Sequence, residues 1–278
     1  MSRSIFIESS GTYRGDIVQL AKEGLEELMP YKIISRSELR QGYYVARKAV
    51  LEHNVTASFG DYSNEIGRSG IFFQEMAYKM HVFDTVQRIS LKDLMYGSVS
   101  EEEVKANLEL GLMKDAYHSI IFGKPEIKME GIATLTGRSK ITVSSGSTTL
   151  TTGSALHQKV VEAKRKSEEY KEKLDGFYHL LLPHKFSHLL LDLYSEPQYI
   201  TVKDALLKDH NIITSVFKGL SHPILYEPNP EVMFVPMIPE IFFRRFAAAD
   251  GDYIHASMES AGVIHFHPQE VVEITISS

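Results

Sequence analysis

The chain of 278 residues contains no cysteine. It therefore forms no disulfide, and it has no thiol nucleophile, thiolate zinc site or iron–sulfur cluster. We expect its stability to come from packing and from contacts between subunits. With 43% hydrophobic and 24% charged residues, the composition is that of a globular protein with a large core, which excludes a disordered or collagen-like chain.

A long apolar run is missing as well. No stretch approaches the about 18 consecutive apolar residues that a spanning helix needs. Glu8 follows the short apolar start Ile5-Phe6-Ile7, where a signal peptide would continue its apolar segment. We therefore expect no membrane association and a protein that stays in the compartment where it is made.

The chain has no excess of positive charge. It carries 30 basic and 36 acidic residues, for a formal charge of −6. This balance argues against a face that neutralises many phosphates of a DNA duplex, so nucleic acid is expected as a non-specific neighbour rather than a ligand. The mixed-charge block over 162–173 predicts a solvated helix face with pairs at i,i+4.

Motifs for common enzyme chemistry do not occur in the sequence. The phosphate-binding patterns G-x-x-x-x-G-K and G-x-G-x-x-G, the nucleophile elbow G-x-S-x-G and the zinc motif H-E-x-x-H are all missing. We therefore expect no nucleotide-dependent activity. Together with the resemblance described below, the missing motifs favour a protein with no catalytic residues, no cofactor and no enzymatic activity.

One group of residues has the composition of a metal site. On a strand, His265 and His267 would point to the same face and could share a metal, with Glu270 as a third ligand. A small metal-dependent enzyme using these residues is a remote alternative; we favour incidental surface histidines and predict no metal. His184 and His188 are expected to be partly buried or solvated helix residues. Three further histidines have no partner in the sequence: His210, His222 and His255.

Two stretches of β character stand out between Tyr43 and Ile89. They cover 43–50 and 71–83 and are separated by a segment with three glycines over 59–70. This pattern predicts a long two-stranded excursion. Because an isolated hairpin is marginal in water, we expect it to rest on another subunit.

The strongest helix signal begins at Ser100. Ser100 and Glu103 form a capping box, and the helix is expected to reach Phe122, about 30 Å at 1.5 Å per residue. One face carries apolar residues at helical spacing and is expected to be core: Val104, Leu108, Leu112, Ala116 and Ile120. Other expected helices cover 16–28, 155–174, 184–194 and 202–208. Other expected strands cover 177–182, 212–216, 224–226, 232–237, 241–246, 253–260, 262–266 and 271–276.

The order of these elements resembles the Hong Kong 97-like fold of tailed-phage major capsid proteins, which encapsulin shell proteins share. The resemblance spans about residues 40–278 and is carried by short motifs in a shared order: Leu94-Met95-Tyr96-Gly97, Ile121-Phe122-Gly123, Gly131-Ile132 with Leu135, Leu180-Leu181-Leu182-Pro183, Tyr226-Glu227-Pro228-Asn229-Pro230-Glu231-Val232, Val235-Pro236-Met237, and Gly262-Val263-Ile264 with Pro268. His267 departs from the family pattern, which has an arginine there. The N-terminus has no long helical extension, which implies a separate scaffolding protein or none.

The resemblance implies an α+β fold with five segments: an N-arm (1–42), an extended β-hairpin E-loop (43–89), the first part of a P-domain with a long spine helix (90–153), an α/β A-domain (154–237) and the C-terminal strands of the P-domain (238–278). It implies a structural protein that self-assembles through pentamers and hexamers into an icosahedral virion shell around double-stranded DNA. It would be made in the host cytoplasm and meet portal, scaffolding or decoration proteins. The alternative is an encapsulin-type shell around a cargo enzyme.

Overall fold

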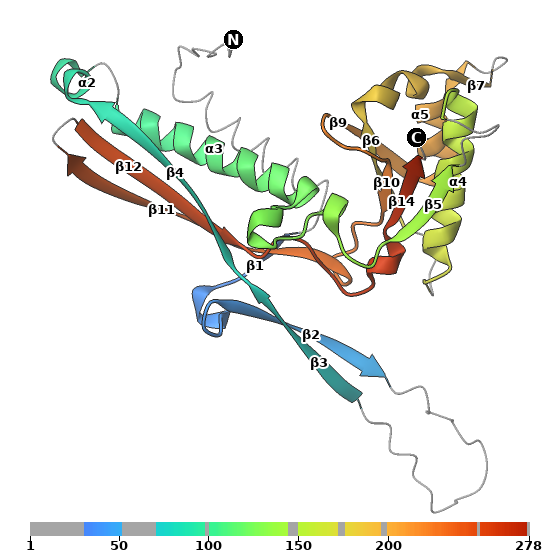
Figure 1. Ribbon diagram of the computed structural model, residues 1–278, viewed down its shortest axis with the longest axis horizontal. Helices are drawn as coiled ribbons and strands as arrows, with labels where there is room; N and C mark the ends of the chain where they lie inside the picture. Colours follow the sequence, from blue (N-terminus) through green and yellow to red (C-terminus); the bar gives the residue numbers. More distant parts are fainter. Residues whose placement is uncertain are drawn as a thin grey trace, which may run out of the picture.

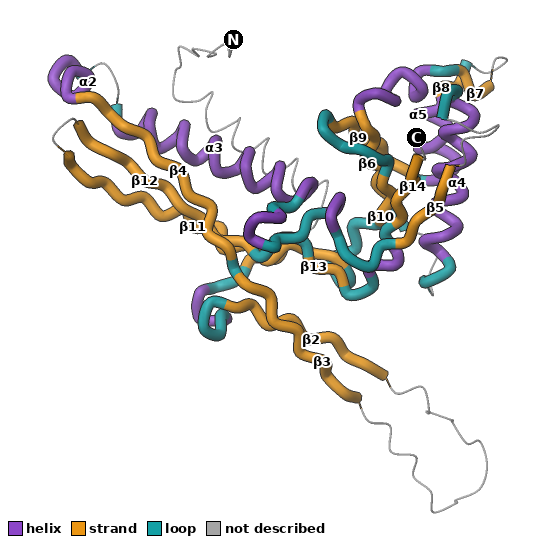
Figure 2. The backbone as a smooth tube through the Cα atoms, in the orientation of Figure 1, coloured by secondary structure: helices purple, strands orange, loops and turns teal. Residues whose placement is uncertain are grey.

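The computed structural model describes residues 31–51, 71–97, 100–143, 150–171, 176–195, 199–248 and 251–276. The helix expected over 16–28 and the glycine-containing segment over 59–70 lie outside these residues. The fold is α+β and elongated (Figure 1). A two-stranded hairpin projects from a sheet lined by one long helix, and a second sheet with its own helices lies at the far end of that helix (Figures 1 and 2).

The first sheet is built around two long antiparallel strands. Its order is β1 (Tyr31–Ile33), β11 (Met233–Ala248), β12 (Gly251–Ser260) and β4 (His81–Ser90), and β13 (Ile264–His265) also pairs with β11. β11 covers both strands that were expected over 232–237 and 241–246, because its pairing with β12 continues across a register shift between Ile238 and Phe242.

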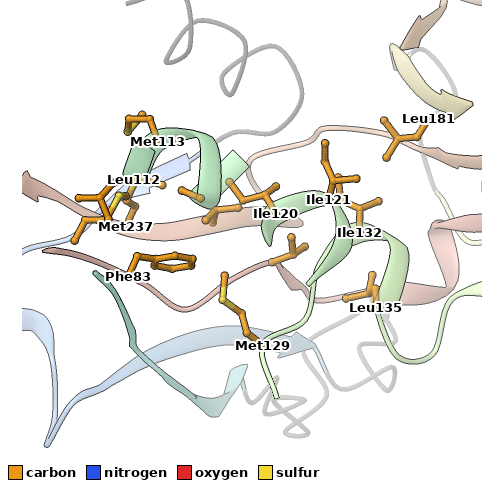
Figure 3. Close-up of a cluster of buried hydrophobic side chains, with 14 of the residues drawn as sticks. Phe83, Leu112, Met113, Ile120, Ile121, Met129, Ile132, Leu135, Leu181 and Met237 are labelled. Atoms are coloured by element: carbon orange, nitrogen blue, oxygen red, sulfur yellow. The ribbon is translucent and has the colours of Figure 1, made fainter. Parts of the chain in front are cut away.

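The long helix α3 (Glu101–Phe122) lies along one face of this sheet, as expected for the centre of the core (Figure 1). Ser100 and Glu103 form the predicted capping box, with Glu103 N donating to Ser100 Oγ at 3.1 Å. All five residues of the predicted apolar stripe are buried. They pack with Phe83, Met129, Ile132 and Met237 in one core cluster (Figure 3). The short helix α2 (Leu91–Tyr96) precedes α3 and is capped by Ser90.

The predicted hairpin is confirmed as β2 (Tyr43–Leu51) paired antiparallel with β3 (Ile71–Lys79). The expected extent of this excursion, to Ile89, is wrong. β4 begins directly after Met80 and pairs along its whole length with β12, because its alternate side chains Phe83 and Ile89 are buried against α3. The hairpin therefore leads directly into an edge strand of the first sheet.

The second sheet has the order β5 (Ser139–Val143), β14 (Val272–Ile276), β10 (Ile224–Tyr226), β6 (Tyr178–Pro183) and β9 (Ile212–Phe217). The helices α4 (Gly153–Glu168) and α5 (Val202–His210) pack on one face. A small pair, β7 (Leu193–Ser195) and β8 (Ile200–Thr201), joins this end of the molecule. Short 3-10 helices cover 36–38, 125–127, 132–134, 184–191 and 268–270.

The chain crosses between the two sheets more often than the predicted segments imply. The C-terminal segment 238–278 contributes to both sheets, because β12 belongs to the first sheet and β14 to the second. In the second sheet, β5 from the segment 90–153 lies beside β14. Both strands are apolar on their inner faces and complete the second core. The opposite face of the second sheet packs against the core cluster that contains the buried side of α3. It contributes Leu181, Ile224 and Tyr226 to that cluster, so the two sheets are joined by continuous packing. Helix α4 ends at Glu168, earlier than expected, and the helix expected over 184–194 is a 3-10 helix over 184–191.

Candidate assembly surfaces

The candidate metal ligands do not form a site. β13 ends at His265, so His267 does not share a strand face with it, and Glu270 ends a separate 3-10 helix. The backbone N–H of His267 donates to His265 Nδ1 at 3.0 Å, which occupies one of the two ring nitrogens. No group of three or more histidine, aspartate or glutamate side chains within the described residues is arranged to hold a metal ion. The strand geometry that we expected for these ligands is therefore wrong.

We predict less than one equivalent of any transition metal in the purified protein, measured by elemental analysis. Changing both His265 and His267 to Ala should leave that content unchanged. The double variant should lower the melting temperature slightly, because His265 is buried and its ring accepts a backbone hydrogen bond worth about 1 kcal/mol. Stoichiometric metal that disappears in the double variant would contradict this and support the enzyme alternative.

The remaining histidines that were singled out have different surroundings. His184 and His188 are exposed on the 3-10 helix. His222 Nδ1 accepts from Ile276 N at 3.3 Å, and His255 Nε2 lies 3.3 Å from an oxygen of the Asp84 carboxylate. His210 packs against another histidine, a contact that the sequence does not suggest.

The hairpin is the first candidate surface. Among the described strands, β2 and β3 pair only with each other, and Figure 1 shows them projecting away from both sheets. Among the side chains that the structure describes, those at the base anchor the hairpin: Tyr44, Ala46 and Met80 are buried in a small cluster with Phe234 and Ile264. The turn at the base places Gln41 and Gly42 in the left-handed region, with φ of 52° and 82°. The strands beyond the base have no second layer within the described structure.

The second candidate surface is the face of the first sheet opposite α3, which we call the open face. Four apolar side chains are exposed on it: Val82 and Val86 of β4, and Phe242 and Phe246 of β11. Phe246 stacks on Tyr253 with an interplanar angle of 3° and a centroid separation of 5.6 Å. These side chains lie on two strands that are separated by β12, and Glu259, Ser257 and His255 of β12 face the same side between them. Several exposed apolar side chains on one sheet face make it a candidate interaction surface.

Charged side chains surround these apolar residues. Arg36 forms an ion pair with Glu259 at 2.7 Å, and its guanidinium lies 4.0 Å from the centre of the Phe242 ring. Asp84 pairs with His255. The open face therefore mixes apolar and charged side chains, as non-obligate protein–protein interfaces do. This surface was not predicted from the sequence, although β4 gave a signal: it is apolar on both faces, at Phe83 and Ile89 on one and at Val82 and Val86 on the other.

A third candidate surface lies at the β7–β8 end of the second sheet. Four large apolar side chains there are strongly exposed, and we call them the apolar rim: Leu191, Leu193, Tyr194 and Tyr199, at 74%, 52%, 46% and 82% of their full exposure. Exposed tyrosine and leucine side chains that cluster in this way are costly in a monomer and favour burial against a partner.

The described helices include none that is long and apolar enough to cross a membrane.

Known proteins were compared with the chain by sequence and by structure. No protein-family model and no curated protein sequence matches it. The capsid of Myoviridae phage XM1 matches at a TM-score of 0.70 and 13% identity, with 100% of this chain and 96% of that chain covered. The virus-like particle from Pyrococcus furiosus matches at 0.66 and 14% identity, covering 95% and 99%. The capsid of the native GTA particle matches at 0.65 and 10% identity, covering 100% and 94%. The chain therefore has the fold of phage capsid proteins, and the fold predicted from the sequence resemblance is confirmed.

Proposed function

We propose that this chain is a structural major capsid protein that assembles through pentamers and hexamers into an icosahedral shell around double-stranded DNA. The observation that carries the proposal is the hairpin β2–β3, which is anchored only at its base and pairs with no other described strand. A hairpin of this length is marginal when it stands alone, and a neighbouring subunit in a closed assembly supplies the missing surface. The capsid fold of the solved relatives supports the same conclusion.

The open face is the surface that we propose to receive a neighbour's hairpin. Every subunit has both an open face and a hairpin. If each hairpin packs on the open face of the next subunit around a ring, both surfaces are buried in every subunit. Its exposed Val82, Val86, Phe242 and Phe246 would be removed from water, which is favourable by roughly 25 cal/mol per Å² of apolar surface. The charged pairs Arg36–Glu259 and Asp84–His255 on the same face would set the register and orientation of the contact.

The charge of the chain fits a container better than a DNA-binding protein. A formal charge of −6 gives the chain as a whole no electrostatic attraction to DNA, which fits packaged DNA as a non-specific neighbour. We infer a role without catalysis, in which portal, scaffolding or decoration proteins are the other partners. The location would be the virion, after synthesis in the host cytoplasm.

The division into an N-arm, an E-loop, a P-domain and an A-domain also stays a proposal. The sheets support placing α3 and the long strands β11 and β12 in the P-domain and α4 with β6 in the A-domain. They favour moving β4 out of the E-loop, and β5 and β14 into the A-domain sheet.

An encapsulin-type shell with an enzyme cargo is the second candidate. It is favoured by the match to a virus-like particle, which covers 95% of this chain at a TM-score of 0.66. The genes beside this one distinguish the two: portal and terminase genes support a phage capsid, and a gene for a cargo enzyme supports an encapsulin-type shell.

The direct test is whether the purified full-length chain forms closed shells. We expect uniform hollow particles by electron microscopy and a single species of megadalton mass by analytical ultracentrifugation. Particles from the native source should contain DNA that is protected from added nuclease. A protein that remains monomeric under all assembly conditions, including those with its neighbouring gene products, would contradict the proposal. Particles that hold an enzyme and no DNA would support the second candidate.

A further inference from the structure

A buried histidine lies between the two helices of the second sheet and the apolar rim. His157 on α4 is only 7% exposed. Its ring packs against the ring of Tyr194 on β7, with centroids 4.4 Å apart, and against the ring of His210 at the end of α5, 5.1 Å away. Three elements, α4, α5 and β7, thus meet at one imidazole.

The ring of His157 has no acceptor for a second proton in the described structure. Its Nε2 is buried and makes no hydrogen bond with any described residue. The carboxylate of Asp192 lies at the N-terminal end of α4. It accepts a hydrogen bond from the backbone N–H of Gly153, the first residue of the helix, at 2.7 Å. A buried polar atom without a partner is unusual and destabilising, and a charged one costs considerably more.

Charges of both signs face the two imidazoles. On α4, Lys164 donates to the carbonyl oxygen of His210 at 3.0 Å and lies 3.6 Å from Glu168, and Arg165 lies on the same helix. On α5, Asp209 is the acidic neighbour of both rings.

These surroundings favour the neutral form of both rings. Burial first, and then His210, lowers the pKa of His157, and Asp209 opposes this shift. Burial first, and then Lys164 and Arg165, lowers the pKa of His210, while Asp209 and Glu168 oppose it. A histidine with a lowered pKa in the folded state takes up its proton more readily when unfolded. The neutral imidazoles therefore contribute to the free energy of unfolding at a pH above the ordinary histidine pKa of about 6.5. This contribution is lost as the pH falls below that value.

We propose that His157 and His210 form a pH-sensitive latch that holds α4, α5 and β7 together at neutral pH and loosens the apolar rim in mild acid. Protonation would place a charge without an acceptor between Tyr194 and a second imidazole. The least costly response is to move β7 and expose the ring to water, since β7 and β8 pair only with each other among the described strands. Tyr194 belongs to the rim, so the latch connects pH to a candidate assembly surface. The inference does not require that the chain forms shells.

The test compares His157→Phe with the unchanged protein between pH 7.5 and pH 5.0. Phenylalanine retains an aromatic ring against Tyr194 but binds no proton. We expect the melting temperature of the unchanged protein to fall as the pH is lowered. The melting temperature of the variant should fall by roughly 2 °C less over the same pH range, which is the shift that about 1 kcal/mol gives in a chain of this size. His184→Phe, the same substitution at an exposed position, should behave as the unchanged protein does.

A second measurement covers the case in which His157→Phe does not fold. Hydrogen exchange of the unchanged protein, corrected for the intrinsic effect of pH, should increase at pH 5.0 in peptides from β7 and from the part of α4 around His157, and not in peptides from α3. Equal acid sensitivity of His157→Phe and the unchanged protein would overturn the proposal. An increase in exchange that is uniform over the chain, or none in β7, would overturn it as well.

Discussion

Shortening the hairpin β2–β3 is expected to leave a folded, soluble protein that forms no shells. The variant replaces residues 49–73 by Asn-Gly, which joins Lys48 to Gln74, two residues that are opposite each other in the hairpin register. The anchored base is retained, including the buried Tyr44 and Ala46. Because the removed part pairs with no other described strand, the free energy of unfolding of the monomer should change by less than about 1 kcal/mol. Assembly should be lost completely, as seen by electron microscopy and sedimentation.

The proposed receiving surface gives this prediction a matched partner. Val86→Lys places a charge on the open face at the edge strand β4, where the valine is 49% exposed, and should block assembly as the shortened hairpin does. Val86→Thr keeps the shape and the strand propensity and should assemble. Both changes are at the surface, so the melting temperature should hardly differ between them. Normal particles from the shortened hairpin would show that the hairpin is not needed between subunits, and normal particles from Val86→Lys alone would place its contact elsewhere.

The elements that the sequence predicted well are those with local signals. Ser100 and Glu103 mark the start of α3 within four residues, and the stripe from Val104 to Ile120 repeats at helical spacing along it. The hairpin is equally local, since its two strands are separated by one turn-rich segment. For these elements, the interactions that decide the structure lie close together in the chain.

The partners of the strands could not be predicted in the same way. β14 pairs with β5, whose residues lie more than 100 positions earlier in the sequence, and β4 pairs with β12 across a similar distance. A run of apolar residues shows that a strand is buried but not which sheet buries it. The short strand β13 illustrates a further limit. The strand expected over 262–266 is interrupted because Gly262 has a φ of 80° and Val263 N donates to the carbonyl oxygen of Glu130 at 3.0 Å, outside the sheet.

Proximity in the sequence was also a poor guide to which histidines lie together in the fold. His265 and His267 are two residues apart, yet the strand ends between them. His157 and His210 are far apart in the sequence, and the packing of α4 against α5 brings their rings to 5.1 Å. No spacing rule finds such a pair, because tertiary packing alone creates it.

Leu112→Asp is expected to abolish the soluble protein. Leu112 is 1% exposed and packs at the centre of the cluster between α3 and the first sheet, close to Met237 (Figure 3). Replacing a buried leucine by a small residue costs about 2–5 kcal/mol, and a carboxylate buried among apolar groups adds to this cost. Since a protein of this kind is stable by about 5–15 kcal/mol, most or all of its stability would be lost. Because the same cluster joins the two sheets through Leu181 and Ile224, neither sheet should remain folded.

Asn107→Asp is the matched control for this change. It adds the same carboxylate to the same helix, five positions earlier, where the side chain is exposed. A charge at an exposed helix position changes stability by only a few tenths of a kcal/mol, even with Glu103 four residues before it, so this variant should be soluble and melt within about 2 °C of the unchanged protein. The measurement is the soluble fraction after expression, together with thermal unfolding followed by circular dichroism. If Leu112→Asp were as soluble as Asn107→Asp and melted at the same temperature, the face of α3 that carries Leu112 would not be the core of the protein, and the joining of the two sheets through it would be wrong.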